Sequence, residues 1–196
     1  MTGTYEWNPM PHIADVRCPS CSGLAKFEFA EIVRIELKKD VDFFKENSLF
    51  DYEMFKDSCG HKWHAAIYYA GLHGNSTDAI QDLPQGYQPS NWNHSRFLSQ
   101  NRQPQIGSLK CLTCQTAKKH TLNWPEEAYY SIEYKGSVLW AFHKESAIEL
   151  RDYIASTDRN EDKYKWRGFL LHIPTTFKKH NARDRVVKSL NRLLNV

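Results

Sequence analysis

Four of the five cysteines in this chain form two Cys-x-x-Cys pairs, Cys18/Cys21 and Cys111/Cys114. Two cysteines at this spacing can wrap a tight turn around one metal ion, with each thiolate about 2.3 Å from a zinc ion. A closed zinc site needs four ligands, so each pair must be completed by residues from elsewhere in the chain. The spacing therefore predicts a fold built around bound metal.

The first pair has candidate partners in a later segment. Cys59 is followed closely by His61 and His64, and either histidine is a suitable zinc ligand. On an extended strand the two histidines would point to opposite faces, and His61, directly after the turn, is the preferred ligand. The sequence thus predicts a first zinc site made of Cys18, Cys21, Cys59 and one histidine.

Roughly residues 16–70 resemble the zinc-ribbon class of small metal domains. Cys18-Pro19-x-Cys21 resembles the first knuckle of a ribbon, and Cys59-Gly60-His61 resembles the end of the second knuckle. The chain departs from the ribbon pattern at Lys56, where a standard second knuckle has a cysteine. The resemblance implies a structural Zn²⁺ ion, with a histidine in place of the missing cysteine.

The second pair has fewer partners. His120 is the third candidate ligand, and His143 is the best available fourth. Two separate sites are the main expectation, but two other arrangements remain open. The two Cys-x-x-Cys pairs could form a single all-cysteine site, or Cys59 and His61 could join the second pair in a cross-brace similar to RING domains.

A metal site with four protein ligands is closed. A catalytic zinc keeps one position open for water, and no His-Glu-x-x-His or His-x-Glu motif is present. The zinc is therefore expected to be structural, and an enzyme is the less favoured class.

Composition divides the chain into three segments. Residues 1–74 form the first module, residues 75–108 a connector rich in Gly, Pro, Asn, Gln and Ser, and residues 109–196 the second module. Apolar residues alternate in both modules, with a hairpin turn expected at Lys135-Gly136, and helical spacing follows near the C-terminus. The expected fold class is α+β, with two small zinc-supported antiparallel β modules, the second carrying C-terminal helices.

The two Cys-x-x-Cys pairs are preceded by similar residues. Val16-Arg17 precedes the first pair, and Leu109-Lys110 precedes the second. The likeness fits a degenerate internal duplication, and it equally fits the general way in which a strand leads into a zinc knuckle.

Charge is concentrated near the C-terminus. From Lys163 onward nine basic residues accompany one acidic residue, Asp184. A helix expected at about 182–194 has an apolar arc and an opposite basic arc. The side chains expected to contact phosphate groups are Lys178, Lys179, Arg183, Arg185, Lys188 and Arg192. The leading functional prediction is a non-catalytic zinc protein that binds nucleic acid.

Two other functions are retained. The first is a zinc-dependent adapter for protein–protein interaction, in which the acidic segment 40–57 or the basic helix recognises a protein partner. The second is a metal-dependent nuclease that uses His120 and Asn123 beside a structural Cys-x-x-Cys pair, although no acidic residue paired with histidine supports it.

The N-terminal segment and the hydropathy of the chain bear on its location. No apolar run approaches the roughly 18 residues needed to cross a membrane, and residues 1–12 lack a basic start followed by an apolar core. A cytoplasmic protein without a membrane partner is expected, in a compartment where thiols stay reduced and available to metal.

Overall fold

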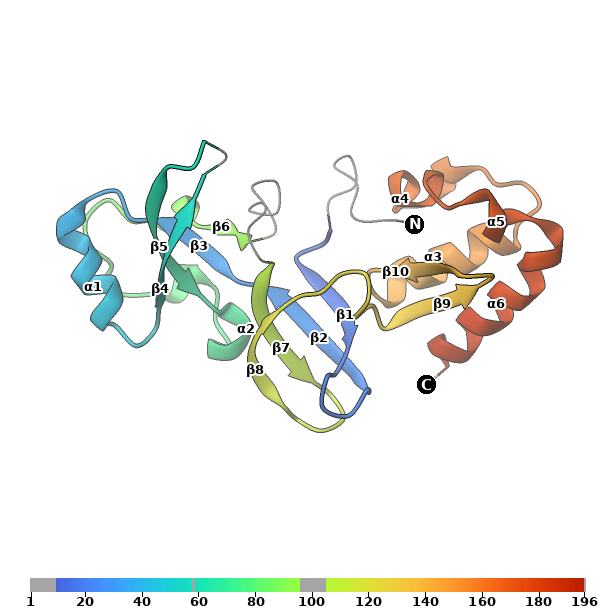
Figure 1. Cartoon of the computed structure of the whole chain (residues 1–196), viewed down its shortest axis with the longest axis horizontal. Helices are drawn as coiled ribbons and strands as arrows, with labels where there is room; N and C mark the ends of the chain where they lie inside the picture. Colours follow the sequence, from blue (N-terminus) through green and yellow to red (C-terminus); the bar gives the residue numbers. More distant parts are fainter. Residues whose placement is uncertain (1–9, 58, 96–104, 196) are drawn as a thin grey trace. The chain divides into compact units, whose positions relative to one another are not determined.

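A computed structural model describes residues 10–57, 59–95 and 105–195 (Figure 1). The strands are β1 (Ile13–Arg17), β2 (Leu24–Phe29), β3 (Glu31–Arg34), β4 (Asp51–Lys56), β5 (Lys62–Tyr68), β6 (Asn93–His94), β7 (Ile106–Cys111), β8 (Ala117–Thr121), β9 (Tyr130–Tyr134) and β10 (Ser137–Ala141). The α-helices are α1 (Val41–Glu46), α2 (Ala70–His73), α3 (Lys144–Ala155), α4 (Arg167–Leu171), α5 (Thr175–Lys178) and α6 (His180–Leu194).

The strands form three sheets, with the orders β1-β2-β7-β8, β4-β5-β3-β6 and β10-β9. Strand β3 pairs antiparallel with β5 and β6, and antiparallel pairs also join β4 to β5, β7 to β8 and β9 to β10. Helices α3 to α6 all follow the last strand. The predicted α+β class, with antiparallel sheets and C-terminal helices, is confirmed.

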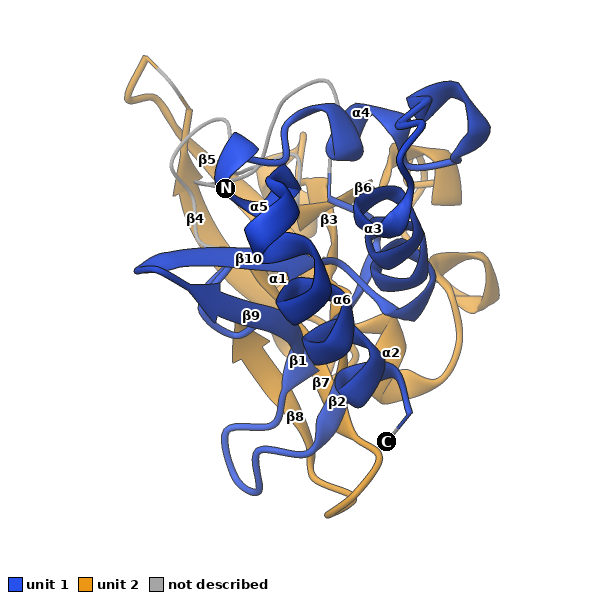
Figure 2. Cartoon of the chain, turned by 90° about the vertical axis from the view of Figure 1, so that its right-hand side faces the viewer, with its two compact units in different colours: residues 1–25, 123–196 blue, residues 26–122 orange. Residues whose placement is uncertain are grey.

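Contacts divide the chain into two compact units, coloured separately in Figure 2. Unit 1 comprises residues 1–25 and 123–196, and unit 2 comprises residues 26–122. This division joins the two ends of the chain in one unit. Composition, in contrast, divides the chain into three consecutive segments. The expected modules 1–74 and 109–196 remain a prediction about which parts fold independently.

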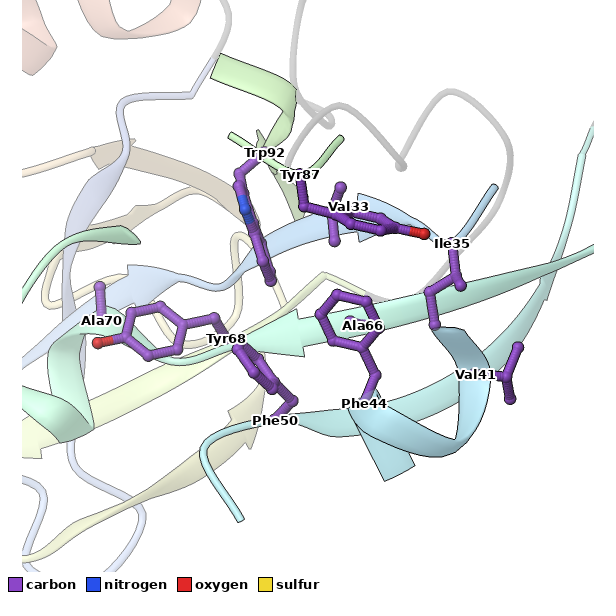
Figure 3. Close-up of a cluster of buried hydrophobic side chains, with 10 residues drawn as sticks. All are labelled: Val33, Ile35, Val41, Phe44, Phe50, Ala66, Tyr68, Ala70, Tyr87 and Trp92. Carbon is purple, nitrogen blue, oxygen red and sulfur yellow. The ribbon is translucent and has the colours of Figure 1, made fainter. Parts of the chain in front are cut away.

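Unit 2 contains a sheet that is buried on both faces. Along β3 and β5, successive residues alternate between two apolar clusters, because side chains of a strand point alternately to opposite faces. The cluster on one face, drawn in Figure 3, consists of Val33, Ile35, Val41, Phe44, Phe50, Ala66, Tyr68, Ala70, Tyr87 and Trp92. The cluster on the other face consists of Ala30, Ile32, Phe55, Ala65, Ile67, Tyr69 and Ile106.

The described part of the polar segment 75–108 is folded onto unit 2. The indole of Trp92 stacks on the ring of Phe50, with centroids 5.6 Å apart, and the Tyr87 hydroxyl accepts a hydrogen bond of 3.1 Å from the Glu36 amide. Residues 96–104 lie outside the described part of the chain. The aromatic residues of this segment therefore complete a core, although the segment's composition is that of a loop.

Gly107 in β7 is a position where the sheet leaves no room for a side chain. An added Cβ would overlap the carbonyl oxygen of Glu28 and lie 2.6 Å from Cζ of Phe27. Backbone cannot swing aside as a flexible side chain does, so Gly107→Ala should destabilise the protein by about 1–3 kcal/mol, near the upper end. Denaturant unfolding measures this change.

The matched control for Gly107→Ala is Lys110→Ala on the same strand. Lys110 is exposed, so its truncation should change the free energy of unfolding by about 0.5 kcal/mol or less. Equal effects of the two substitutions would show that the close approach at Gly107 is not a constraint on the sheet.

Unit 1 is built on the β9–β10 hairpin, which α3 and α6 contact. Lys135 and Gly136 form its turn with φ values of 51° and 72°, as a two-residue turn of the primed type requires. This confirms the predicted hairpin. Fully buried residues from the hairpin and the helices form the core, and the largest are Leu139, Trp140, Phe142, Leu150, Ile154, Phe169 and Phe177.

Strand β1 is held within unit 1 by backbone hydrogen bonds. The Asp15 amide donates to the Phe142 carbonyl at 2.7 Å, and the Arg17 amide donates to the Glu127 carbonyl at 2.8 Å. The buried Asp15 carboxylate accepts a 3.0 Å hydrogen bond from the amide of Lys144, the first residue of α3. A carboxylate at a helix N-terminus is stabilising, so this contact fixes β1, and with it the segment that leads into Cys18.

Candidate metal centre

Each Cys-x-x-Cys pair lies in the turn of a hairpin. Cys18 and Cys21 follow β1 and precede β2, whereas Cys111 is the last residue of β7 and Cys114 lies in the turn before β8. In both pairs the first cysteine is buried and the second is exposed. Each turn therefore presents one thiol toward the interior and one at the surface.

The two turns have matching backbone geometry. The amides of Cys18 and Cys111 each donate a 2.8 Å hydrogen bond to a carbonyl five residues later, that of Gly23 or of Thr116. Four residues after the first cysteine, Ser22 has a φ of 60° and Gln115 a φ of 59°. A positive φ is uncommon for residues other than glycine, so its occurrence at equivalent positions shows that both turns adopt one tightly defined shape.

Backbone amides also point at the buried sulfurs. The Ser20 amide donates to Cys18 Sγ at 3.4 Å, and the Thr113 amide donates to Cys111 Sγ at 3.3 Å. The Cys114 amide donates to the same Sγ of Cys111 at 3.4 Å. Hydrogen bonds of this kind orient thiolate ligands and stabilise their charge around a metal ion.

The Sγ atoms of the four cysteines all lie within 4.8 Å of one another. In a tetrahedral complex with zinc–sulfur bonds of about 2.3 Å, the sulfurs are about 3.8 Å apart, so the observed spacing suits one ion with four thiolate ligands. None of the five cysteines, all of which are described, forms a disulfide. Cys18, Cys21, Cys111 and Cys114 are thus a metal-capable group, compatible with a zinc-ribbon-like site.

This grouping corresponds to the all-cysteine arrangement rather than to the two separate sites that were the main expectation. The turn at Cys111, and not the segment at Cys59, supplies the other two cysteines of this group. Strand order explains the difference, because β2 and β7 are neighbours in the sheet although the segment of residues 30–105 separates them in sequence.

The histidines expected as ligands are placed elsewhere. His120, in β8, faces the ring of Phe27 with centroids 6.1 Å apart. His143 precedes α3, and its Nδ1 accepts a hydrogen bond of 3.3 Å from the Ser146 amide. His64 shares a 2.6 Å hydrogen bond with the Tyr52 hydroxyl. None of these three is in the four-cysteine group.

Cys59 and His61 belong to a different group, at the tip of the β4–β5 hairpin. A carboxylate oxygen of Asp57, Cys59 Sγ and a ring nitrogen of His61 all lie within 4.8 Å of one another. The pKa of Asp57 is lowered, chiefly by a hydrogen bond from the His61 amide, and also by the Cys59 amide and the charge of a protonated His61. Asp57 was missed as a candidate because single carboxylates are common on surface hairpins.

One signal in the sequence pointed to the observed pairing of knuckles. Val16-Arg17 and Leu109-Lys110 precede the two Cys-x-x-Cys pairs, and the structure shows that both are strand ends leading into turns of one shape. Cys59 instead lies three residues after the end of β4, whereas Cys18 directly follows β1 and Cys111 is the last residue of β7. Asp57 closes its turn by accepting from the Cys59 amide.

The basic residues near the C-terminus fall into two sets. Lys163, Lys165 and Arg167 form ion pairs with Asp158, Glu145 and Asp162 respectively. The other six are the residues expected to contact phosphate groups, and they lie in α5, in α6 and at Lys179 between these helices. Lys179, Arg185, Lys188 and Arg192 are exposed, whereas Lys178 and Arg183 are half-buried.

In comparisons with known proteins, no family model, no curated protein and no solved structure matches this chain. No helix in the described ranges is long and apolar enough to cross a membrane. What the protein does must therefore be inferred from the chemistry of its own residues.

Proposed function

We propose that this protein binds one structural Zn²⁺ ion through Cys18, Cys21, Cys111 and Cys114, and binds nucleic acid through the basic surface of α5 and α6. Zinc is the metal that four thiolates select most readily in proteins without an iron–sulfur cluster. Four protein ligands leave no coordination position for water or substrate, so the ion would hold the two turns together rather than catalyse a reaction.

The observation that carries the nucleic-acid proposal is the division of α6 into two faces. Ala182, Val186, Leu190 and Leu194 are buried, and this face contacts α3 and β9. The opposite face carries exposed basic side chains, those of Arg185, Lys188 and Arg192. Phosphate groups attract such a basic helix face, since neutralising them releases bound counterions.

The surroundings of α6 indicate which of its basic residues would contribute most to phosphate binding. Arg183, Lys188 and Asn191 line a shallow hollow of about 310 Å³, together with the acidic Asp184. The guanidinium of Arg185 lies over the ring of Tyr134 at 5.7 Å, which holds that side chain near the β9–β10 hairpin. Lys188 and Arg192 are therefore the residues on which phosphate binding would depend most.

Nucleic-acid affinity should fall steeply as the salt concentration rises. For duplex DNA the slope of log affinity against log salt is about −0.9 per phosphate contact, so three to five contacts give roughly −3 to −5. Replacing Lys188 and Arg192 with Gln should flatten the slope by about one to two and weaken all sequences alike. Titration of labelled duplex and single-stranded oligonucleotides at two salt concentrations measures this.

The control is the double substitution Lys163→Gln and Arg167→Gln. These residues are also in unit 1 but already pair with acidic side chains, so the slope should change by less than about one. Asp184→Asn should strengthen binding, because it removes a negative charge from the hollow beside Lys188. Two results together would favour the adapter function instead. The unmodified protein would show no saturable binding of any oligonucleotide at low salt, and the Lys188 and Arg192 variant would no longer capture a protein partner.

A further inference from the structure

The tip of the β4–β5 hairpin brings three metal-binding side chains together within five residues. Asp57, Cys59 and His61 occupy alternate positions, and one potential ligand atom from each lies within 4.8 Å of the other two. All three belong to unit 2 and to a single turn. This group is separate from the four-cysteine group, and the structural zinc proposed above does not use it.

Backbone hydrogen bonds hold this turn in shape. The Asp57 amide donates to the His61 carbonyl at 2.9 Å, and the Gly60 amide donates to the Asp57 carbonyl at 3.0 Å. Gly60 has a φ of +85°, a conformation that glycine adopts without steric cost. The turn is thus closed by main-chain contacts, and the positions from which the three side chains project are fixed.

The two oxygens of the Asp57 carboxylate have different roles. Oδ1 accepts hydrogen bonds of 2.9 Å from the amides of both Cys59 and His61. Oδ2 is directed toward His61 Nδ1, at 3.3 Å. One oxygen therefore orients the carboxylate, as outer hydrogen bonds orient the ligands of metal sites, and the other faces the histidine.

The donor atoms select a class of metal. One thiolate, one imidazole nitrogen and one carboxylate oxygen suit Zn²⁺ and its spectroscopic substitute Co²⁺, whereas Ca²⁺ and Mg²⁺ prefer oxygen ligands alone. The side chain of His61 is 81% exposed and that of Asp57 is 37% exposed, so solvent reaches the group. Three protein ligands would leave the fourth tetrahedral position to water.

We propose that Asp57, Cys59 and His61 form a second, solvent-accessible site for a zinc-class divalent ion, with three protein ligands and one open coordination position. Because its ligands are exposed and only three, this site exchanges metal more readily than the four-cysteine site. Its open position accepts a water molecule or a ligand from outside the chain.

The experiment is a Co²⁺ titration of the full-length protein loaded with one equivalent of Zn²⁺, which fills the four-cysteine site and leaves the second site empty. The thiolate-to-cobalt charge-transfer absorption reports the binding of Co²⁺. We expect one additional Co²⁺ equivalent with the intensity of a single thiolate ligand. Cys59→Ser should abolish this band. His61→Ala should weaken Co²⁺ binding by at least about 10- to 100-fold, because loss of a residue that only hydrogen-bonds to a metal ligand already has an effect of that size. Asp57→Asn should also weaken it, while its remaining oxygen still accepts the two amide hydrogen bonds.

The matched control is His64→Ala, three residues further along the same hairpin. His64 bonds to the Tyr52 hydroxyl and is outside the three-residue group, so this variant should bind the additional Co²⁺ like the unmodified protein. Absence of an additional equivalent, or a band that survives Cys59→Ser, would overturn the proposal. So would loss of the band in the His64 variant together with its retention in the His61 variant.

Discussion

Cys111→Ser should abolish stoichiometric zinc binding and unfold the β1-β2-β7-β8 sheet. Apparent binding free energies for structural zinc are about 10–16 kcal/mol near neutral pH, and this energy contributes directly to folding. A whole domain is typically stable by only about 5–15 kcal/mol. Loss of the ion would therefore remove most or all of the free energy that stabilises the folded state. The three remaining thiols would then lie close together without a metal ion.

Elemental analysis of protein prepared without chelator measures the zinc content. Hydrogen exchange across β7 and β8 reports on the sheet, where protection should fall toward that of an unfolded chain. Cys18→Ser should behave like Cys111→Ser, because both residues are the buried members of their pairs. Chelation of the unmodified protein should reproduce the same loss of protection.

Cys59→Ser is the matched control for the two cysteine variants. Cys59 is exposed and lies outside the four-cysteine group, so this variant should keep the tightly bound zinc and its folded sheet. If Cys59→Ser instead released that zinc while Cys111→Ser retained it, the site first expected from the sequence would be the correct one.

Trp140→Ala should be the most destabilising of the single core substitutions in unit 1, by about 3–5 kcal/mol. The Trp140 side chain is fully buried, and its ring centroid lies 5.1 Å from Phe142, 5.2 Å from Trp124 and 5.5 Å from Phe169. Truncation would leave a cavity among the rings of Trp124, Phe142 and Phe169. It could collapse only if the Trp124–Phe142 and Phe142–Phe169 contacts also changed. Denaturant unfolding of the zinc-loaded protein, with hydrogen exchange localised to α3 and α6, measures the effect.

Two further variants separate cavity formation from other causes. Val138→Ala alters a residue that is 42% exposed on the same strand, so its effect should be about 0.5 kcal/mol or less. Trp140→Phe keeps most of the ring volume and removes an indole N–H that has no hydrogen-bond partner among the described residues. It should cost less than about 1.5 kcal/mol. A cost for Trp140→Ala as small as that for Val138→Ala would contradict this account of the core.

Several local features follow from the sequence alone because neighbouring residues determine them. Lys135-Gly136 forms the expected hairpin turn, since the required positive φ values depend on the two residues themselves. The last helix buries the apolar arc that its 3.6-residue spacing predicts, and it begins at His180, two residues before the expected start. Each Cys-x-x-Cys pair forms a tight turn with a positive φ four residues after the first cysteine.

Other expectations depended on a neighbour that the sequence does not specify. The expected alternation of apolar residues in the first module does not show where one strand ends and the next begins: the structure interrupts it at Ala30 and assigns β2 and β3 to different sheets. Ala30 donates to the carbonyl of Ile106 and accepts from the amide of Ser95, both of which are distant in sequence. The period of the apolar residues indicates which side chains are buried, but it does not identify the strand that pairs with the segment in a sheet.

The sequence by itself determined the local geometry: two Cys-x-x-Cys turns, a hairpin and an amphipathic C-terminal helix. Only the tertiary structure decided which cysteines lie close enough together to share a metal ion. Cys59 is closer in sequence to Cys18 than Cys111 is, yet the order β1-β2-β7-β8 brings the turn at Cys111 to the first pair. A metal ion selects ligands by their distance in space, and that distance depends on pairing between strands far apart in the chain, where sequence spacing carries little information.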